Sequence, residues 1–151
     1  MKLLPLAAAA IVVGSTVALA QGDVPAAVKA RQGQMQIQSH AISILGGMAR
    51  GNMEYDAELA SQAAQDLRAV SMLSVDLLWP EGTSTEEVQG TRALPAIWSD
   101  WEGFLDDWEA FNAAVDAVEA AAPNGLEALQ PAIGTLGQSC GACHDDFRQS
   151  N

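Results

Sequence analysis

The last part of the sequence carries a regular apolar pattern that constrains the fold more than any other feature. Its apolar residues recur at alternating steps of three and four: Leu126, Leu129, Ile133, Leu136, Cys140, Cys143 and Phe147. This spacing lines one face of a helix and is typical of a helix packed lengthwise against others. No stretch of the sequence alternates apolar and polar residues as a half-buried strand does. The pattern therefore predicts an all-α fold.

Helix-starting and helix-stopping residues divide the chain into four segments. We expect helices at about 24–50, 56–74, 95–122 and 126–149. Gly51 is a plausible stop for the first, and Asp56 is a good N-cap for the second. The third opens at Pro95, in the first-turn position that proline tolerates, and stops before Pro123, whereas Pro131 is awkward near the start of the last. Four helices joined by mostly short turns predict an antiparallel up-down-up-down four-helix bundle.

The other three segments carry apolar stripes of their own. The third has a well-marked stripe: Ile97, Trp101, Phe104, Leu105, Trp108, Phe111, Val115 and Val118. The second has a weaker one: Leu59, Ala63, Leu67, Val70 and Leu73. The stripe of the first includes two polar residues: Val24, Val28, Arg31, Met35, Gln38, Ile42, Leu45 and Ala49. A second stripe on the first segment could face another subunit, so a homodimer stays open: Ile37, Ala41, Ile44 and Met48.

The first twenty residues have the pattern of a secretory signal peptide. A basic start and a nearly uncharged apolar run precede Ala18-Leu19-Ala20, a small-x-small cleavage pattern. The run is short for a membrane anchor, and no later stretch is apolar enough to span a membrane. We therefore expect residues 1–20 to be removed, Gln21 to begin the mature chain, and residues 21–151 to form a single domain without membrane insertion.

The charge balance argues against one class of function. The chain has 7 Lys and Arg residues against 19 Asp and Glu, a formal net charge of −12. Loss of Lys2 with the signal peptide leaves 6 against 19, or −13. With no basic patch to neutralise phosphates, nucleic-acid binding is not expected. An acidic surface could instead steer a basic partner.

Cys140-Gly141-Ala142-Cys143-His144 is a C-x-x-C-H sequence, the attachment pattern of haem c. Two thioether bonds on one helical turn would fix the porphyrin, and the adjacent imidazole would reach the iron. A thioredoxin-like C-x-x-C pair occurs in an α/β fold, which the sequence does not predict. A zinc site needs more ligands than the motif supplies. A disulfide between residues three apart in one helix has poor geometry. We therefore predict one covalently attached haem c, held by Cys140, Cys143 and His144.

Arg31 and Met35 are candidate haem-contacting residues of the first helix. A buried arginine needs an anionic partner, which could be a haem propionate or a neighbouring Asp or Glu. Met35 could bind the iron, or it could simply fill the core as methionine often does. The residues alone leave these alternatives open.

Four short motifs are spread along the mature chain: Val28-Lys29-Ala30-Arg31-Gln32, Tyr55-Asp56, Ile97-Trp98-Ser99-Asp100, and the run from Cys140 to Arg148. With the C-x-x-C-H motif near the C-terminus, they resemble the class II cytochromes c, the family that includes cytochrome c′. The resemblance implies a four-helix bundle, often dimeric, with the haem between helices near one end. It also implies that Arg31 and Gln32 contact the haem edge and propionates, and that Arg148 lies near the proximal face.

Met35 falls on the distal position of that family, where its members divide. In cytochrome c′ the distal residue usually blocks the iron without binding it, and the five-coordinate, high-spin iron can take NO or CO. In the low-spin members a methionine here is the sixth ligand and the protein is an electron carrier. His40 matches no family ligand, and we expect it on the surface or on a dimer face.

The sequence therefore predicts a monohaem c-type cytochrome of the bacterial periplasm that transfers single electrons to and from redox proteins it does not identify. The alternative is a five-coordinate cytochrome c′-type protein that binds NO or CO. An enzyme is not expected, because a peroxidase-like site needs polar distal groups, and the first helix offers Gln34 or Gln38 but no His–Arg pair.

Overall fold

The structure, a computed structural model, describes residues 24–150. Its helical elements are α1 (Ala26–Ala49), α2 (Ala57–Ser71), α3 (Val75–Leu78), α4 (Ala96–Ser99), α5 (Trp101–Ala121), the 3-10 turn η1 (Ala122–Asn124) and α6 (Leu126–Phe147). Within this range the one piece of β-type pairing is an isolated bridge between Ala93 and Arg148. No helix of the described range is long and apolar enough to cross a membrane. The predicted signal peptide, residues 1–20, lies outside the described residues.

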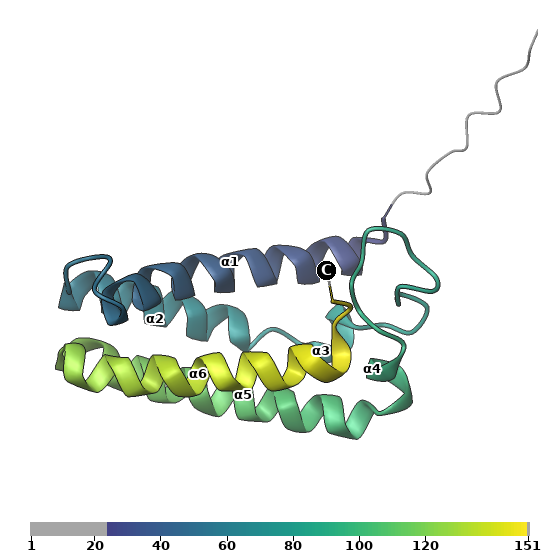
Figure 1. Cartoon of the computed structure of the whole chain (residues 1–151). Helices are drawn as coiled ribbons and strands as arrows, with labels where there is room; N and C mark the ends of the chain where they lie inside the picture. The colour runs from purple at the N-terminus through teal and green to yellow at the C-terminus, as the bar shows by residue number, and fades with distance from the viewer. Residues whose placement is uncertain (1–23, 151) are drawn as a thin grey trace, which may run out of the picture.

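The four long helices form an antiparallel bundle, which confirms the predicted fold class (Figure 1). Helices α1 and α5 each pack against both α2 and α6, so every long helix has two long neighbours. The short helices α3 and α4 belong to the long connection between α2 and α5. This connection lies at the end of the bundle where α1 begins and α6 ends (Figure 1).

Local chemistry explains where two of the helices begin. The Asp56 carboxylate accepts hydrogen bonds of 2.9 Å from the backbone N–H groups of Glu58 and Leu59, so it caps α2 as predicted. Gly125 has a φ of 98°, a backbone conformation that a side chain would strain, and this turn separates η1 from α6. Helix α6 continues through Pro131 despite the missing N–H of that residue.

Three of the predicted helix boundaries are wrong. Helix α2 stops at Ser71 rather than near residue 74. The predicted helix 95–122 is broken at Asp100, whose side chain accepts from the N–H of Gly103 and so caps a new helix, α5. Helix α6 stops at Phe147 rather than 149, because the Phe147 carbonyl accepts from the Leu94 N–H and the chain then becomes extended.

The apolar stripe predicted for α6 faces the bundle, with Leu129, Leu136 and Phe147 buried. The stripe predicted for the second helix is wrong at both ends, because Leu59 is 38% exposed and Leu73, beyond the helix, is 47% exposed. The buried residues of α2 are mostly small: Ala60, Ala63, Ala64, Leu67 and Ser71. Small side chains on this face allow a close approach of the neighbouring helices.

The second stripe predicted on the first helix belongs mainly to the core. Ala41 and Met48 are buried in the bundle and Ile44 is partly buried, whereas Ile37 is 48% exposed. Three of the four residues therefore widen the inward face of α1 rather than forming a separate outer face. The homodimer stays a prediction.

Two clusters of buried side chains fill the bundle. The larger is aliphatic, apart from Phe111, and joins all four long helices: Ala41, Leu45, Met48, Ala60, Ala63, Ala64, Leu67, Phe111, Ala114, Val115, Val118, Ala122, Leu129 and Leu136. The smaller cluster is mainly aromatic: Ala93, Ile97, Phe104, Trp108 and Phe147. Phe104 is central to it, with the rings of Trp79 and Phe147 edge-on at 5.0 and 5.5 Å between centroids.

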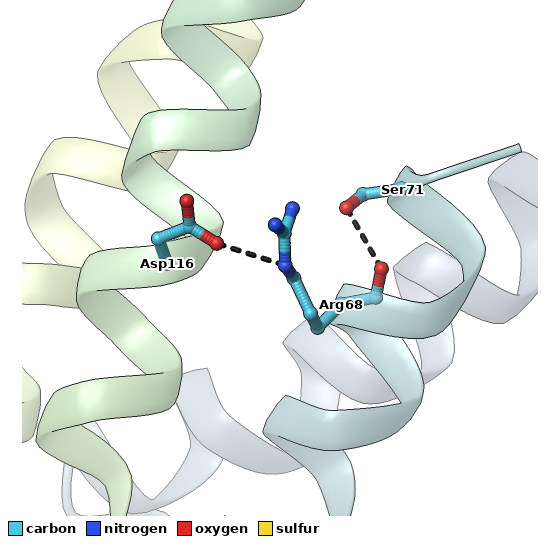
Figure 2. Close-up of polar contacts among 3 residues, drawn as sticks. All are labelled: Arg68, Ser71 and Asp116. Atoms are coloured by element: carbon cyan, nitrogen blue, oxygen red, sulfur yellow. Dashed lines mark hydrogen bonds and ion pairs between the residues drawn. The ribbon is translucent and has the colours of Figure 1, made fainter.

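Figure 2 shows the ion pair between α2 and α5, in which Arg68 Nε lies 2.8 Å from Asp116 Oδ1. The buried Ser71 hydroxyl donates to the Arg68 carbonyl at 2.9 Å on the same helix. Because the two charged side chains are 29% and 54% exposed, the pair contributes at most about 1 kcal/mol. Apolar packing, rather than this ion pair, therefore holds these two helices together.

Tyr55 connects the start of α2 to the turn before α6. Its hydroxyl donates to the Ala122 carbonyl at 2.7 Å and accepts from the Gly125 N–H at 2.9 Å. Tyr55→Phe removes both bonds and should lower the free energy of unfolding by about 1–2 kcal/mol, measured by urea denaturation. As a control, Ser61→Ala removes only a hydrogen bond to the carbonyl of Ala57 within α2, and should change the free energy by less than about 0.5 kcal/mol. Equal losses for the two variants would contradict a special role for Tyr55.

Candidate haem site

The C-x-x-C-H motif occupies the last two turns of α6. Cys140 and Cys143 are partly buried free thiols, so the disulfide alternative is not formed. His144 follows directly and is also partly buried. Within residues 24–150 no group of three or more His, Cys, Asp or Glu side chains is arranged to hold a metal ion, so the structure offers no support for a zinc site.

A cavity of about 40 Å³ brings the motif together with α1 and α5. Its lining residues come from three helices: Met35 and Gln38 from α1, Asp107, Trp108 and Phe111 from α5, and Ser139, Cys140, Cys143 and His144 from α6. The aliphatic and aromatic clusters meet here, since Phe111 belongs to the first and Trp108 to the second. The structure therefore places both thiols, the imidazole and the predicted distal methionine around one space.

The surroundings of the motif favour its neutral forms. Burial, with the negative charge of Asp107 as the next cause, raises the pKa of the Cys143 thiol to about 11. Burial also raises the pKa of the Cys140 thiol. Burial lowers the pKa of His144, and the positive charges of Arg148 and Arg92 lower it further. A neutral imidazole is the form that binds a metal.

The residues around the cavity are of the kinds that contact a haem, although its volume of about 40 Å³ is far smaller than a porphyrin. Trp108 and Phe111 supply flat apolar walls, as a porphyrin requires. Gln38 is only 6% exposed, and its Nε2 is buried without a hydrogen-bond partner among the described residues. An unpaired buried donor at a cavity wall indicates that its acceptor comes within reach only when a group is bound.

Arg31 is buried and held by uncharged groups. It is 3% exposed, and its guanidinium donates to Thr83 Oγ1 at 2.8 Å, to the Thr83 carbonyl at 2.6 Å and to Thr91 Oγ1 at 2.8 Å. It also lies over the ring of Trp79, 4.6 Å from the centroid. The predicted ion pair with a neighbouring Asp or Glu is not formed, because hydroxyl and carbonyl oxygens take its place. Contact of Arg31 with a propionate stays a prediction, since Arg31 does not line the cavity.

The remaining candidates lie on the surface. Gln32 is exposed and donates to the Gly90 carbonyl at 2.6 Å, and His40 is exposed as expected. Arg148 lines a second, larger cavity of about 340 Å³ on the other side of the motif, together with Leu94, His144, Asp145, Gln149 and Ser150. His144 therefore lies between two cavities, one facing the bundle interior and one facing the C-terminal residues.

Sequence reasoning missed two polar residues of the site, Asp107 and Ser139. Asp107 immediately precedes Trp108 and lies beside the predicted apolar stripe. This position was the one sequence signal that could have pointed to Asp107 as a site residue. Burial raises the pKa of the Asp107 carboxyl, and the charges of Asp146 and Asp106 raise it further. A partly buried carboxylate therefore lies close to Cys143 and His144.

The comparisons with known proteins agree with this arrangement. A family model described as cytochrome C′ matches residues 26–148. The chain is 36% identical over 124 residues to cytochrome c-554 from Cereibacter sphaeroides. The aligned region covers 82% of this chain and 81% of the relative. A solved structure of cytochrome c′ from Rhodobacter sphaeroides is 40% identical and has a TM-score of 0.81, covering 83% of this chain and 96% of that one.

A nitric oxide complex of a variant cytochrome c′ from Alcaligenes xylosoxidans is 32% identical, with a TM-score of 0.72, and covers 82% of this chain and 94% of that one. The helical bundle and its sequence motifs thus match this family over nearly the whole described range. The chain therefore belongs to the cytochrome c′ family, the class II cytochromes c, and carries one covalently attached haem c.

Proposed function

We propose that the protein is a periplasmic one-electron carrier whose haem is attached to Cys140 and Cys143 and bound through its iron by His144. The observation that carries the proposal is the cavity shared by these three residues and Met35. Proteins of this family are generally haem proteins without enzymatic activity, and they are periplasmic in bacteria. The signal-peptide pattern at the start of the sequence supports export.

The chain's own residues bind and orient the haem. Cys140 and Cys143, on one face of α6, would hold the porphyrin through two thioether bonds in the space lined by α1 and α5. Trp108 and Phe111 exclude water from the buried side, and the lowered pKa of His144 keeps its imidazole neutral for metal binding. The haem supplies a one-electron iron couple, and the rigid helices around it limit structural change between the two states.

We propose further that Met35 is the sixth ligand of the iron. Its side chain is partly buried and lines the same cavity as His144, although the two come from different helices. A thioether is a suitable ligand for c-type haem iron and raises the reduction potential. A ligand from each of two helices would leave no open position for an external molecule, as suits an electron carrier.

A five-coordinate protein that binds NO or CO is the second candidate function. The nitric oxide complex of the variant cytochrome c′ from Alcaligenes xylosoxidans supports it, because that chain shares the fold at 32% identity. In this case Met35 would cover the distal side without binding the iron. The two candidates therefore differ in one bond, between the Met35 sulfur and the iron.

Met35→Ala tests that bond. The wild-type protein should be low-spin by absorption and EPR spectroscopy, and the variant should become high-spin and bind CO in the reduced state. Met48→Ala is the matched control, since Met48 lies on the same helix but is fully buried in the aliphatic cluster. That control should lose about 2–5 kcal/mol of stability without a change of spin state. A high-spin wild-type protein that binds CO would refute the electron-carrier proposal and favour the gas-binding one.

The attachment residues can be tested separately from the function. Acidified organic solvent should leave the haem on the wild-type polypeptide, because thioether bonds survive the treatment. In the double variant Cys140→Ala, Cys143→Ala the same treatment should release all of the haem, measured by absorbance of the extract. Haem that stays with the variant polypeptide would show attachment elsewhere.

Asp107 should lower the reduction potential, since a partly buried negative charge close to the iron favours the more positive oxidised state. Asp107→Asn should therefore shift the potential to a more positive value in optical redox titrations. Asp106 is the adjacent control, because it is exposed and its charge is screened by solvent. Equal shifts for Asp106→Asn and Asp107→Asn would contradict the special position of Asp107.

A further inference from the structure

Two glutamines of α1 are buried, but their amides have different surroundings. Gln34 is 2% exposed, and its Nε2 donates to the Val70 carbonyl of α2 at 2.7 Å. Gln38 is 6% exposed, and its Nε2 has no partner among the described residues. Gln38 lines the haem cavity, whereas Gln34 does not. The amide that lacks an acceptor is thus the one directed to the cofactor side of the helix.

The position of Gln38 limits what its amide can contact on the haem. The cavity is also lined by Cys140 and Cys143, so the vinyl-bearing edge of the porphyrin would lie here. The propionates are on the opposite edge of a porphyrin, so they would be too far away to accept a hydrogen bond from the Gln38 amide. Met35 lies one helical turn before Gln38 on the same face of α1 and lines the same small cavity. The Gln38 Nε2 makes no hydrogen bond to the Met35 sulfur in the structure, and this sulfur is the acceptor that Met35 would offer to it on binding the iron.

We propose that the Gln38 amide donates a hydrogen bond to the iron-bound sulfur of Met35 and thereby raises the reduction potential of the haem. The inference rests on the proposed function, because it requires Met35 as the sixth ligand. A hydrogen bond draws electron density from the sulfur and weakens its donation to the iron. The oxidised iron depends on that donation more than the reduced iron, so the bond stabilises the reduced state. Gln38 is in this sense a positioning residue that acts through Met35.

Gln38→Leu tests the inference, since leucine keeps much of the buried volume but has no donor and no sulfur. The reduction potential should shift to a more negative value, and the methionine–iron charge-transfer band should shift while the protein stays low-spin. Gln34→Leu is the matched control, because it removes a buried amide of the same helix that contacts α2 instead of the cavity. It should lower the stability of the bundle and leave the potential unchanged. Gln38→Ala gives the same loss of the donor if the leucine variant does not accumulate with haem.

The outcomes separate this inference from the proposed function. A low-spin Gln38→Leu protein with an unchanged potential would overturn the inference and leave Met35 as a ligand. Equal shifts for Gln34→Leu and Gln38→Leu would also overturn it, because they would show a general effect of removing buried amides. A high-spin wild-type protein would overturn both the inference and the electron-carrier proposal, since no iron-bound sulfur would then exist.

Discussion

The packing of the inward face of α6 against α1 and α5 determines both the fold and the place of the haem. The residues that fill the core from α6, such as Leu129 and Leu136, share one face of the helix with Cys140 and Cys143. Whatever is attached to the cysteines is therefore directed into the bundle. Stability and cofactor geometry depend on the same contacts, and a change in the register of α6 would disturb both at once.

Much of the fold could be predicted from the sequence because its signals are local. Asp56 caps α2 through its own side chain, and the spacing of three and four along α6 describes the inward face of that helix. The failures arise where contacts between distant segments decide the outcome. Phe147 ends α6 because its carbonyl meets the Leu94 N–H, which lies more than fifty residues earlier in the chain. Leu59 remains exposed because the small residues of α2 face the neighbouring helices.

The candidate site, like the fold, could be predicted where the signal is local and not where distant segments meet. The C-x-x-C-H motif identifies the cofactor by itself, and helical spacing brings Met35 to the side of α1 that lines the cavity. Asp107 has only a weak sequence signal, its position beside the apolar stripe, because its importance comes from the approach of α5 to α6. Arg31 was recognised as a buried cation, but its acceptors, Thr83 and Thr91, lie in a connection without regular structure. Such a partner has no local pattern that would identify it.

Dissolved salt affects the stability of this fold mainly through the repulsion between like charges. The described part of this acidic chain contains a single ion pair, and the buried Arg31 is held by uncharged oxygens, so little attraction between charges is available for salt to weaken. Repulsion among the many exposed carboxylates is the larger electrostatic effect, and dissolved ions reduce it. Rising ionic strength should therefore make the bundle more stable.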